Sequence, residues 1–316
     1  MNSNLYTQYT QKIAAVCDPL PGSIPYESHR PLSVKLCYHG WRLLDLLADK
    51  FPHISEHHWQ TKMSKAELLC NGAPTTLATI VKAGDYIETI YQDVIEPYVD
   101  TAIEILYDDD YYFIINKPAP LPVHACGRYN KNTVVYILSQ AFALWQLRPV
   151  HRLDANTTGV LILAKTKAAA SAITRQFEEH KVYKTYLACV CGHPSNDEFV
   201  CEQAITATAS VAGRRDIAPN QRGVTAHTVI KVLRRNDDET SLVEVTPRSG
   251  RTNQIRLHLA ANGHAIVSDQ IYQETPTESL AFSKDTPIEL HAWKICFIHF
   301  VTDKSIQVTA QPPSWA

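Results

Sequence analysis

The sequence HRLDANTTGVLILAK, residues 151–165, decides the fold of the region around it. Its second half, residues 159–165, is apolar at consecutive positions, which is typical of a central strand covered on both faces of a sheet. Its first half places Asp154 at the mouth of that strand, close to cationic side chains. Such a carboxylate is partly desolvated yet ionised, as a nucleophile or general base must be. Asp154 is therefore a candidate catalytic residue; the alternative is that it only caps a backbone turn.

Strands and helices alternate around this stretch, from residue 103 to residue 316. Alternating apolar residues predict strands, and apolar residues three or four positions apart predict helices. The predicted strands are 111–115, 159–165, 183–191 and 242–245, and the predicted helices are 167–181 and 252–262. This pattern predicts an α+β domain with a mixed, largely antiparallel sheet and flanking helices.

The N-terminal third of the chain has a different organisation. Residues 1–32 contain four prolines and few apolar anchors, which favours an extended arm. Residues 33–92 predict a small α/β module with two helices, at 43–51 and 57–65, followed by a hairpin. Residues 93–102 are acidic and contain a proline, so we expect a linker there.

A second polar segment, PRSGRTNQIRLH at residues 247–258, groups arginines at the start of a predicted helix. Backbone N–H groups at a helix start also point toward an anion, so the segment suits phosphate groups. Its arginines equally suit a buried carboxylate partner. A solvated basic turn is the remaining interpretation.

A third segment, KVYKTYLA at residues 181–188, sets Tyr186 beside lysines on a predicted strand. An aromatic ring in this setting can stack on a base while the lysines hold the phosphate backbone. Packing in a core is the alternative for Tyr186 considered alone.

Taken in order, these segments resemble the motifs of the RluA-type family of RNA pseudouridine synthases. The matching stretches are NKPAPLPVH (116–124), HRLDANTTG (151–159), KTYLACVCG (184–192) and GRTNQIRLHLAANGHAIVSD (250–269). The resemblance covers residues 103–300, and it implies a pseudouridine synthase catalytic domain over residues 103–316. The module at 33–92 resembles an alpha-L RNA-binding domain, through RLLD at 42–45, NG at 71–72 and KAGD at 82–85.

The resemblance also implies roles for individual residues. Asp154 is the catalytic carboxylate, acting at the sugar as nucleophile or base, and Arg256 pairs with it. Tyr186 stacks on the target base, and Arg152 helps to hold the target uridine out of its stack. The further residues expected to contact the substrate are His151, Thr158, Lys184, Arg251 and Gln254.

Some positions depart from the family pattern. Thr158 stands where the family has Ser and keeps the hydroxyl group. Asn253 stands where the family has His, and Pro120 where it has Gly. Neither Asn253 nor Pro120 has a chemical role in the reaction, so we expect them to affect which RNA is accepted.

The implied reaction isomerises uridine in structured rRNA or tRNA to pseudouridine, which requires no cofactor. The scattered cysteines and histidines predict no metal site, and we expect a monomer. Two alternatives remain at this stage. One is a catalytically weak RNA-binding protein or RNA chaperone that uses the same cleft. The other is a glycoside hydrolase, which needs a second carboxylate that the motifs do not supply.

The overall charge first argues against an RNA partner. The 316 residues have a net charge of −2 and are 45% hydrophobic, which excludes a disordered chain. Residues 148–184, however, contain seven Lys and Arg against three Asp and Glu, and residues 213–256 contain nine against five. The positive charge therefore gathers on the motifs and predicts a local basic cleft.

We find no signal peptide or membrane span in the sequence and expect a cytoplasmic protein with no membrane partner.

Overall fold

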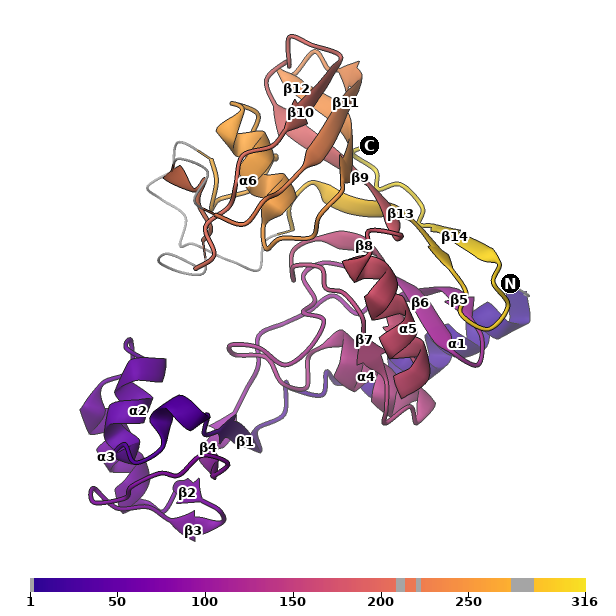
Figure 1. The fold of residues 1–316 in the computed structure, drawn as a ribbon. Coiled ribbons are helices and arrows are strands. Elements are labelled where there is room, and N and C mark those ends of the chain that lie inside the picture. The colour runs from indigo at the N-terminus through magenta and orange to yellow at the C-terminus, as the bar shows by residue number, and fades with distance from the viewer. Residues whose placement is uncertain (1–2, 209–213, 220–222, 274–286) are drawn as a thin grey trace. The chain divides into compact units, whose positions relative to one another are not determined.

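The computed structural model describes residues 3–208, 214–219, 223–273 and 287–316. The chain divides into two compact units (Figure 1). The larger unit combines Met1–Pro21 with Tyr98–Ala316, and the smaller unit is Gly22–Pro97. In sequence, the smaller unit is thus inserted after the first helix of the larger one. The boundaries of these two units differ from the domain boundaries that the sequence predicts.

The N-terminal residues do not form the expected extended arm. Residues Ser3–Cys17 form helix α1, and Tyr26–Ser33 form strand β1 of the smaller unit. Helix α1 buries Ile13, which is 4% exposed, in the core of the larger unit. The ring of Tyr9, one turn earlier, meets Phe142 edge to face at 5.3 Å. The prolines that suggested an arm follow α1 or lie on β1, so they do not interrupt the helix.

The smaller unit is an antiparallel sheet of four strands with two helices. The strand order is β1–β4–β2–β3, where β4 is Tyr86–Val94, β2 is Leu68–Cys70 and β3 is Ala73–Pro74. The helices are α2 (Leu43–Lys50) and α3 (Glu56–Ser64), as expected from the sequence, and a short 3-10 helix, η1, spans Leu36–Tyr38. Their apolar faces pack on the sheet around Trp59, Leu68 and Ile87.

A ten-stranded sheet forms the centre of the larger unit (Figure 1). The strand order is β10–β11–β12–β9–β13–β8–β6–β5, with β14 paired to β13 and β7 paired to β8. The strands are β5 (Glu104–Asp108), β6 (Tyr112–Lys117), β7 (Arg148–Pro149), β8 (Thr158–Ala164), β9 (Tyr183–Cys191), β10 (Glu198–Cys201), β11 (Thr228–Arg235), β12 (Thr240–Pro247), β13 (Leu290–Ile298) and β14 (Ser305–Thr309). Strands β8 and β13 pair in parallel and the other paired strands are antiparallel, which confirms the predicted mixed, largely antiparallel sheet.

The parallel β8–β13 pair requires a glycine at position 159. Gly159 has φ +111°, and a Cβ atom there would lie 2.3 Å from the carbonyl oxygen of Ala292 on β13. Any side chain would therefore push the two strands apart. This glycine links the Asp154 loop to the sheet, because β8 begins directly after that loop.

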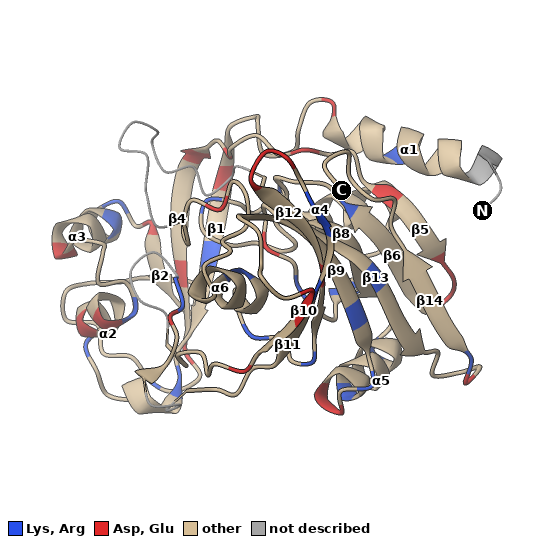
Figure 2. Ribbon diagram, turned by 90° about the horizontal axis from the view of Figure 1, so that it is seen from above, with Lys and Arg blue, Asp and Glu red and all other residues tan. Residues whose placement is uncertain are grey.

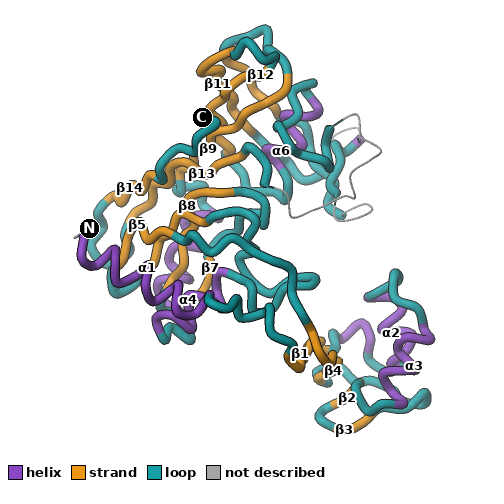
Figure 3. The backbone as a smooth tube through the Cα atoms, turned by 180° about the vertical axis from the view of Figure 1, so that it is seen from behind, coloured by secondary structure: helices purple, strands orange, loops and turns teal. Residues whose placement is uncertain are grey.

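Helices cover both faces of the sheet. Helix α1 and helix α4 (Val134–Phe142) pack on one face of β5, β6 and β8, and Figure 3 shows them in front of the strands. Helix α5 (Lys167–Glu178) packs on the opposite face. Helix α6 (Gln254–Ala261) buries Ile255 and Leu259, as predicted, against β9 and β12. In the described part of the chain, no helix is both long enough and apolar enough to span a membrane.

Candidate active site

A cleft of about 580 Å³ opens where the Asp154 loop, strand β9 and the start of helix α6 meet. It brings together the three segments that the sequence singled out, although Asp154 and Arg256 are 102 residues apart in the chain. The predicted site residues that line it are His151, Arg152, Asp154, Lys184, Tyr186, Arg251, Gln254 and Arg256. Thr158 does not line it, and Thr157 does.

Asp154 and Arg256 form an ion pair in this cleft. Nη1 of Arg256 donates a hydrogen bond of 3.1 Å to Oδ2 of Asp154. The Asp154 side chain is 26% exposed and the Arg256 side chain 5% exposed, so the carboxylate reaches the cleft while its partner is buried. Among the described residues, none donates a hydrogen bond to the other carboxylate oxygen, Oδ1. That oxygen is available to a substrate.

Arg256 is held by a second carboxylate that the sequence did not single out as a site residue. Nε and Nη2 of Arg256 bond to Oδ2 and Oδ1 of Asp269 at 2.6 and 2.7 Å, and Asp269 is fully buried. The ring of Tyr272 lies 5.4 Å from the guanidinium. Burial by itself would lower the pKa of Arg256, but Asp269 and Asp154 outweigh it and raise that pKa, so Arg256 stays charged.

Tyr186 lies on β9, in contact with two hydrophobic clusters of the larger unit. Its side chain lines the cleft and is only partly buried. Burial, followed by the negative charge of Asp154, raises the pKa of its hydroxyl above the ordinary value. Tyr186 is therefore a neutral, flat surface beside the carboxylate, suited to stacking on a base and to donating a hydrogen bond.

Cationic side chains line the same cleft. Lys184 donates a hydrogen bond of 3.2 Å to the carbonyl oxygen of Ser249, and burial lowers the pKa of its ammonium group to about 8. Arg152 is exposed, and burial, followed by the charge of Arg152, lowers the pKa of His124. Arg251 is exposed at the start of α6. Figure 2 shows that basic residues also lie on α5 and β13.

Three of the residues that were predicted to contact the substrate form hydrogen bonds within the protein instead. His151 accepts a hydrogen bond of 3.0 Å at Nε2 from the backbone of Ile162, and burial together with Lys184 lowers its pKa to about 3. Thr158 bonds to Nδ1 of His291 at 2.8 Å. The structure therefore places the His151 ring against β8 and directs Thr158 toward β13.

Gln254 is the third of these residues, and it organises the loop before α6. Its Oε1 accepts hydrogen bonds from Oγ of Ser249 at 2.8 Å and from the backbone N–H of Arg251 at 3.0 Å. Its Nε2 donates to the carbonyl oxygen of His227 and to Oγ1 of Thr228. Because both ends of the buried amide are used, Gln254 shapes the cleft without a free group for substrate.

Lys117, at the end of β6, is bonded to the Asp154 loop at the carbonyl oxygen of Ala155. Its Nζ is fully buried and donates to the carbonyl oxygens of Pro118, Leu121 and Ala155, the last at 3.2 Å. Burial lowers its pKa to about 7, despite the attraction of Asp154 and Asp100. The Asn-Lys-Pro stretch at 116–118 was the signal for this residue, but no local pattern indicates its contact with residue 155.

The arrangement as a whole suits chemistry at a sugar that carries a base. A carboxylate with one free oxygen lies beside a neutral aromatic ring, and cations at the rim can hold phosphates. Among the residues that the structure describes, no three or more His, Cys, Asp or Glu side chains are grouped so that they could hold a metal ion.

Comparisons with known proteins agree with this geometry. A family model described as RNA pseudouridylate synthase matches residues 111–261. The dual-specificity RNA pseudouridine synthase RluA of Yersinia pestis is 33% identical over 196 residues, which cover 62% of this chain and 92% of that protein. Pseudouridylate synthase RPUSD2 of Mus musculus is 32% identical over 237 residues, covering 75% of this chain and 42% of that protein. The chain thus spans less than half the length of this mouse relative.

The fold also matches a solved structure. Human RNA Pseudouridylate Synthase Domain Containing 1 superposes with a TM-score of 0.57 and 28% sequence identity, over 69% of this chain and 87% of that one. The superposition and the sequence matches thus identify the same family. The chain therefore belongs to the RluA-type family of RNA pseudouridine synthases.

Proposed function

We propose that this protein isomerises specific uridines in structured RNA, either rRNA or tRNA, to pseudouridine. The observation that carries the proposal is the Asp154 carboxylate, held at one oxygen by Arg256 and placed beside Tyr186 in a cleft lined by cations. Family membership supports the same reaction.

The reaction breaks the bond between N1 of uracil and C1′ of the ribose and forms a bond between C5 and C1′. The hydrogen on C5 leaves as a proton and N1 gains one, so no electrons are exchanged with a cofactor. Oδ1 of Asp154, which accepts no hydrogen bond from the described residues, acts at the sugar as nucleophile or base. Arg256 holds the other oxygen, Oδ2, in place while the base turns.

The base must leave its stack to reach Asp154, which costs a few kcal/mol. Tyr186 offers a ring on which the extruded uracil stacks, and its neutral hydroxyl can donate a hydrogen bond to the turning base. Arg152 is exposed at the mouth of the cleft, where its cation can hold the displaced strand. Lys184 and Arg251 then hold the neighbouring phosphates.

The smaller unit, Gly22–Pro97, is proposed to add RNA affinity, as an alpha-L RNA-binding domain would. Between residues 36 and 91 it contains five Lys and Arg against six Asp and Glu, so we expect its contribution to be weaker than that of the cleft. A monomeric state and a cytoplasmic location also belong to the proposal. Size measurement in solution and cell fractionation test these two points.

The target is found by mapping pseudouridines in RNA from cells with and without the gene. We expect one or a few positions to lose the modification and to regain it when the wild-type protein is supplied. Protein with Asp154→Asn should not restore them. Restoration by Asp154→Asn would instead favour an RNA-binding or chaperone function that uses the same cleft.

A further inference from the structure

We infer that Asp269 is a positioning residue of the active site: it occupies the Nε–Nη2 edge of the Arg256 guanidinium and thereby directs Nη1 toward Asp154. The inference deepens the proposed function and rests on it. Asp269 follows helix α6 and lies behind Arg256, away from the cleft lining. It acts on the reaction through Arg256 alone.

The geometry of the guanidinium carries the inference. Asp269 binds the edge formed by Nε and Nη2 with two short bonds, of 2.6 and 2.7 Å, in the bidentate arrangement that arginine favours. Because the guanidinium is planar and rigid, fixing this edge also fixes the direction of Nη1. The 3.1 Å bond from Nη1 to Asp154 is longer than both. Asp154 therefore receives the remaining, weaker contact.

Asp269 is itself fixed by the turn in which it lies. Its backbone N–H donates to the carbonyl oxygen of Ile266 at 3.1 Å, and its Oδ1 accepts a hydrogen bond from the N–H of Ile271 at 3.2 Å. The side chain is fully buried. The carboxylate that holds Arg256 is thus part of a rigid backbone turn.

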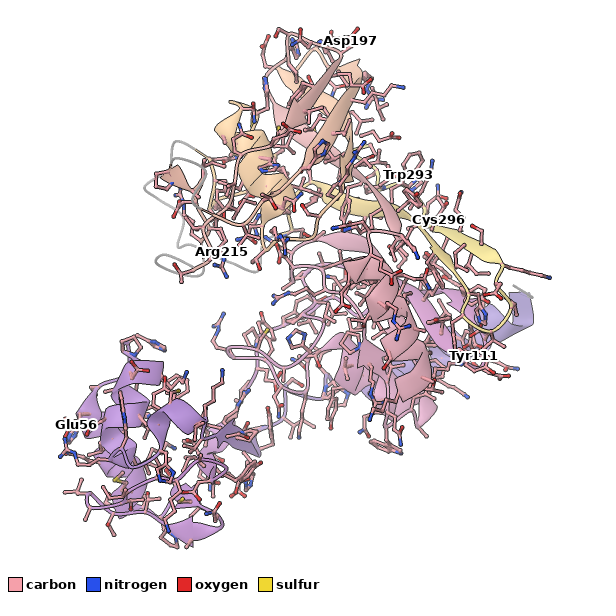
Figure 4. All side chains as sticks on the ribbon, viewed as in Figure 1. Glu56, Tyr111, Asp197, Arg215, Trp293 and Cys296 are labelled. Atoms are coloured by element: carbon pink, nitrogen blue, oxygen red, sulfur yellow. The ribbon has the colours of Figure 1, made fainter. Side chains whose placement is uncertain are left out.

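Tyr272 covers the guanidinium and closes the cluster. Its hydroxyl accepts a hydrogen bond of 3.2 Å from Asn253 and bonds to both backbone groups of Arg215 at 3.0 Å. Figure 4 labels Arg215 in the part of the unit that contains α6. Because these hydrogen bonds hold the Tyr272 ring in place, the ring restricts rotation of the Arg256 guanidinium.

The orientation of Arg256 determines whether Oδ1 of Asp154 stays free. Without Asp269, Arg256 could turn its two-pronged edge toward Asp154 and bind both carboxylate oxygens. Oδ1 of Asp154 would then be occupied and unable to act at the ribose. Asp269 therefore keeps Oδ1 of Asp154 free while Oδ2 stays paired with Arg256. Its loss should lower kcat and leave KM for RNA unchanged.

A double-mutant cycle tests this inference. We expect Asp269→Asn to lower kcat about 100-fold, as a small misplacement of a catalytic group can do, with KM within about twofold of wild type. In the Arg256→Lys background, Asp269→Asn should cause no further loss. Asp197→Asn, which removes a surface partner of Arg235, is the matched control and should leave kcat unchanged. Independent, multiplying losses in the double variant would overturn the inference.

A spectroscopic measurement tests the inference independently of enzymatic activity. The Nε–H of Arg256, bonded to a buried carboxylate, should give a proton NMR signal that exchanges slowly with water and is absent in Arg256→Lys. It should persist in Asp154→Asn and disappear in Asp269→Asn. Loss of the signal in Asp154→Asn would overturn the inference even if Asp269→Asn did not fold. If the wild type shows the signal but forms no pseudouridine, the proposed function fails while the positioning by Asp269 stands.

Discussion

Nη1 of Arg256 lies 3.1 Å from Oδ2 of Asp154, although 102 residues separate them in the chain. The same guanidinium also neutralises Asp269, so that one buried cation serves two carboxylates. We expect removal of this cation to lower stability more than removal of the Asp154 carboxylate, because Asp269 has no access to water.

We predict that Arg256→Met, which keeps the length but removes the charge, lowers the free energy of unfolding by about 3–5 kcal/mol. The physical reason is that Asp269 becomes an uncompensated buried charge. Asp154→Asn leaves the Arg256–Asp269 pair intact and serves as the control, with a loss of less than about 1 kcal/mol. Urea unfolding of the three proteins measures both values. Equal stability of Arg256→Met and wild type would contradict the buried pair.

RNA affinity should weaken as the pH rises through about 8. The pKa of Lys184 is lowered to about 8 by burial, so Lys184 is a cation below this pH and neutral above it. Lys184→Arg keeps the charge and should remove this step from the pH profile of Kd. Binding of a labelled RNA at constant salt between pH 6.5 and pH 9.5 provides the measurement. An identical pH dependence in both proteins would show that Lys184 does not contact the RNA.

Stability should depend on Lys117 between pH 7 and pH 10.5. The pKa of Lys117 falls from 10.5 in an unperturbed lysine to about 7 in the folded protein. In this range the unfolded chain binds a proton that the native protein does not bind, so the free energy of unfolding rises with pH. The contribution of Lys117 has a slope of up to about 1.4 kcal/mol per pH unit.

Lys117→Met provides the comparison, because it removes this contribution and leaves other titrating groups in place. We expect Lys117→Met to be less stable overall by about 2–4 kcal/mol, since three carbonyl oxygens lose their donor. Urea unfolding at several pH values yields the difference between the two proteins. If the wild type and Lys117→Met show parallel pH profiles, the buried lysine is protonated throughout.

Gly159→Ala should separate β8 from β13. The new methyl group would lie 2.3 Å from the carbonyl oxygen of Ala292, and the position has φ +111°. We expect a loss of about 3 kcal/mol or more in unfolding free energy, together with loss of activity because the Asp154 loop moves. Gly263→Ala has a similar positive φ but no neighbour within 4 Å, and should cost about 1 kcal/mol. Similar losses in both variants would mean that the close approach of the strands is unimportant.

The sequence predicted the centre of the larger unit better than its edges. The strand at 159–165 and the helix at 252–262 have strong local patterns, and the structure contains them as β8 and α6. Helix α1 was missed because Tyr9 and Ile13, its apolar anchors, are spread among polar residues. Their value as anchors depends on Phe142, which is more than 120 residues away.

The site was predictable where the motif and the contact coincide. Asp154, Tyr186 and Arg256 meet in one cleft, as the ordered motifs implied. Which residue of the Thr157–Thr158 pair lines the cleft was not predictable, because it depends on how β8 pairs with β13. The roles of Lys117 and Asp269 likewise depend on contacts between distant segments.

The most direct test of the proposed function measures tritium released from RNA that contains uridine labelled at C5. Wild-type protein should release tritium in step with pseudouridine formation and without free uracil, because the detached base is rejoined through C5 to the same ribose. Asp154→Asn should release none. Undiminished release by Asp154→Asn would contradict the catalytic role of Asp154, and free uracil in the wild-type reaction would contradict isomerisation and favour hydrolysis.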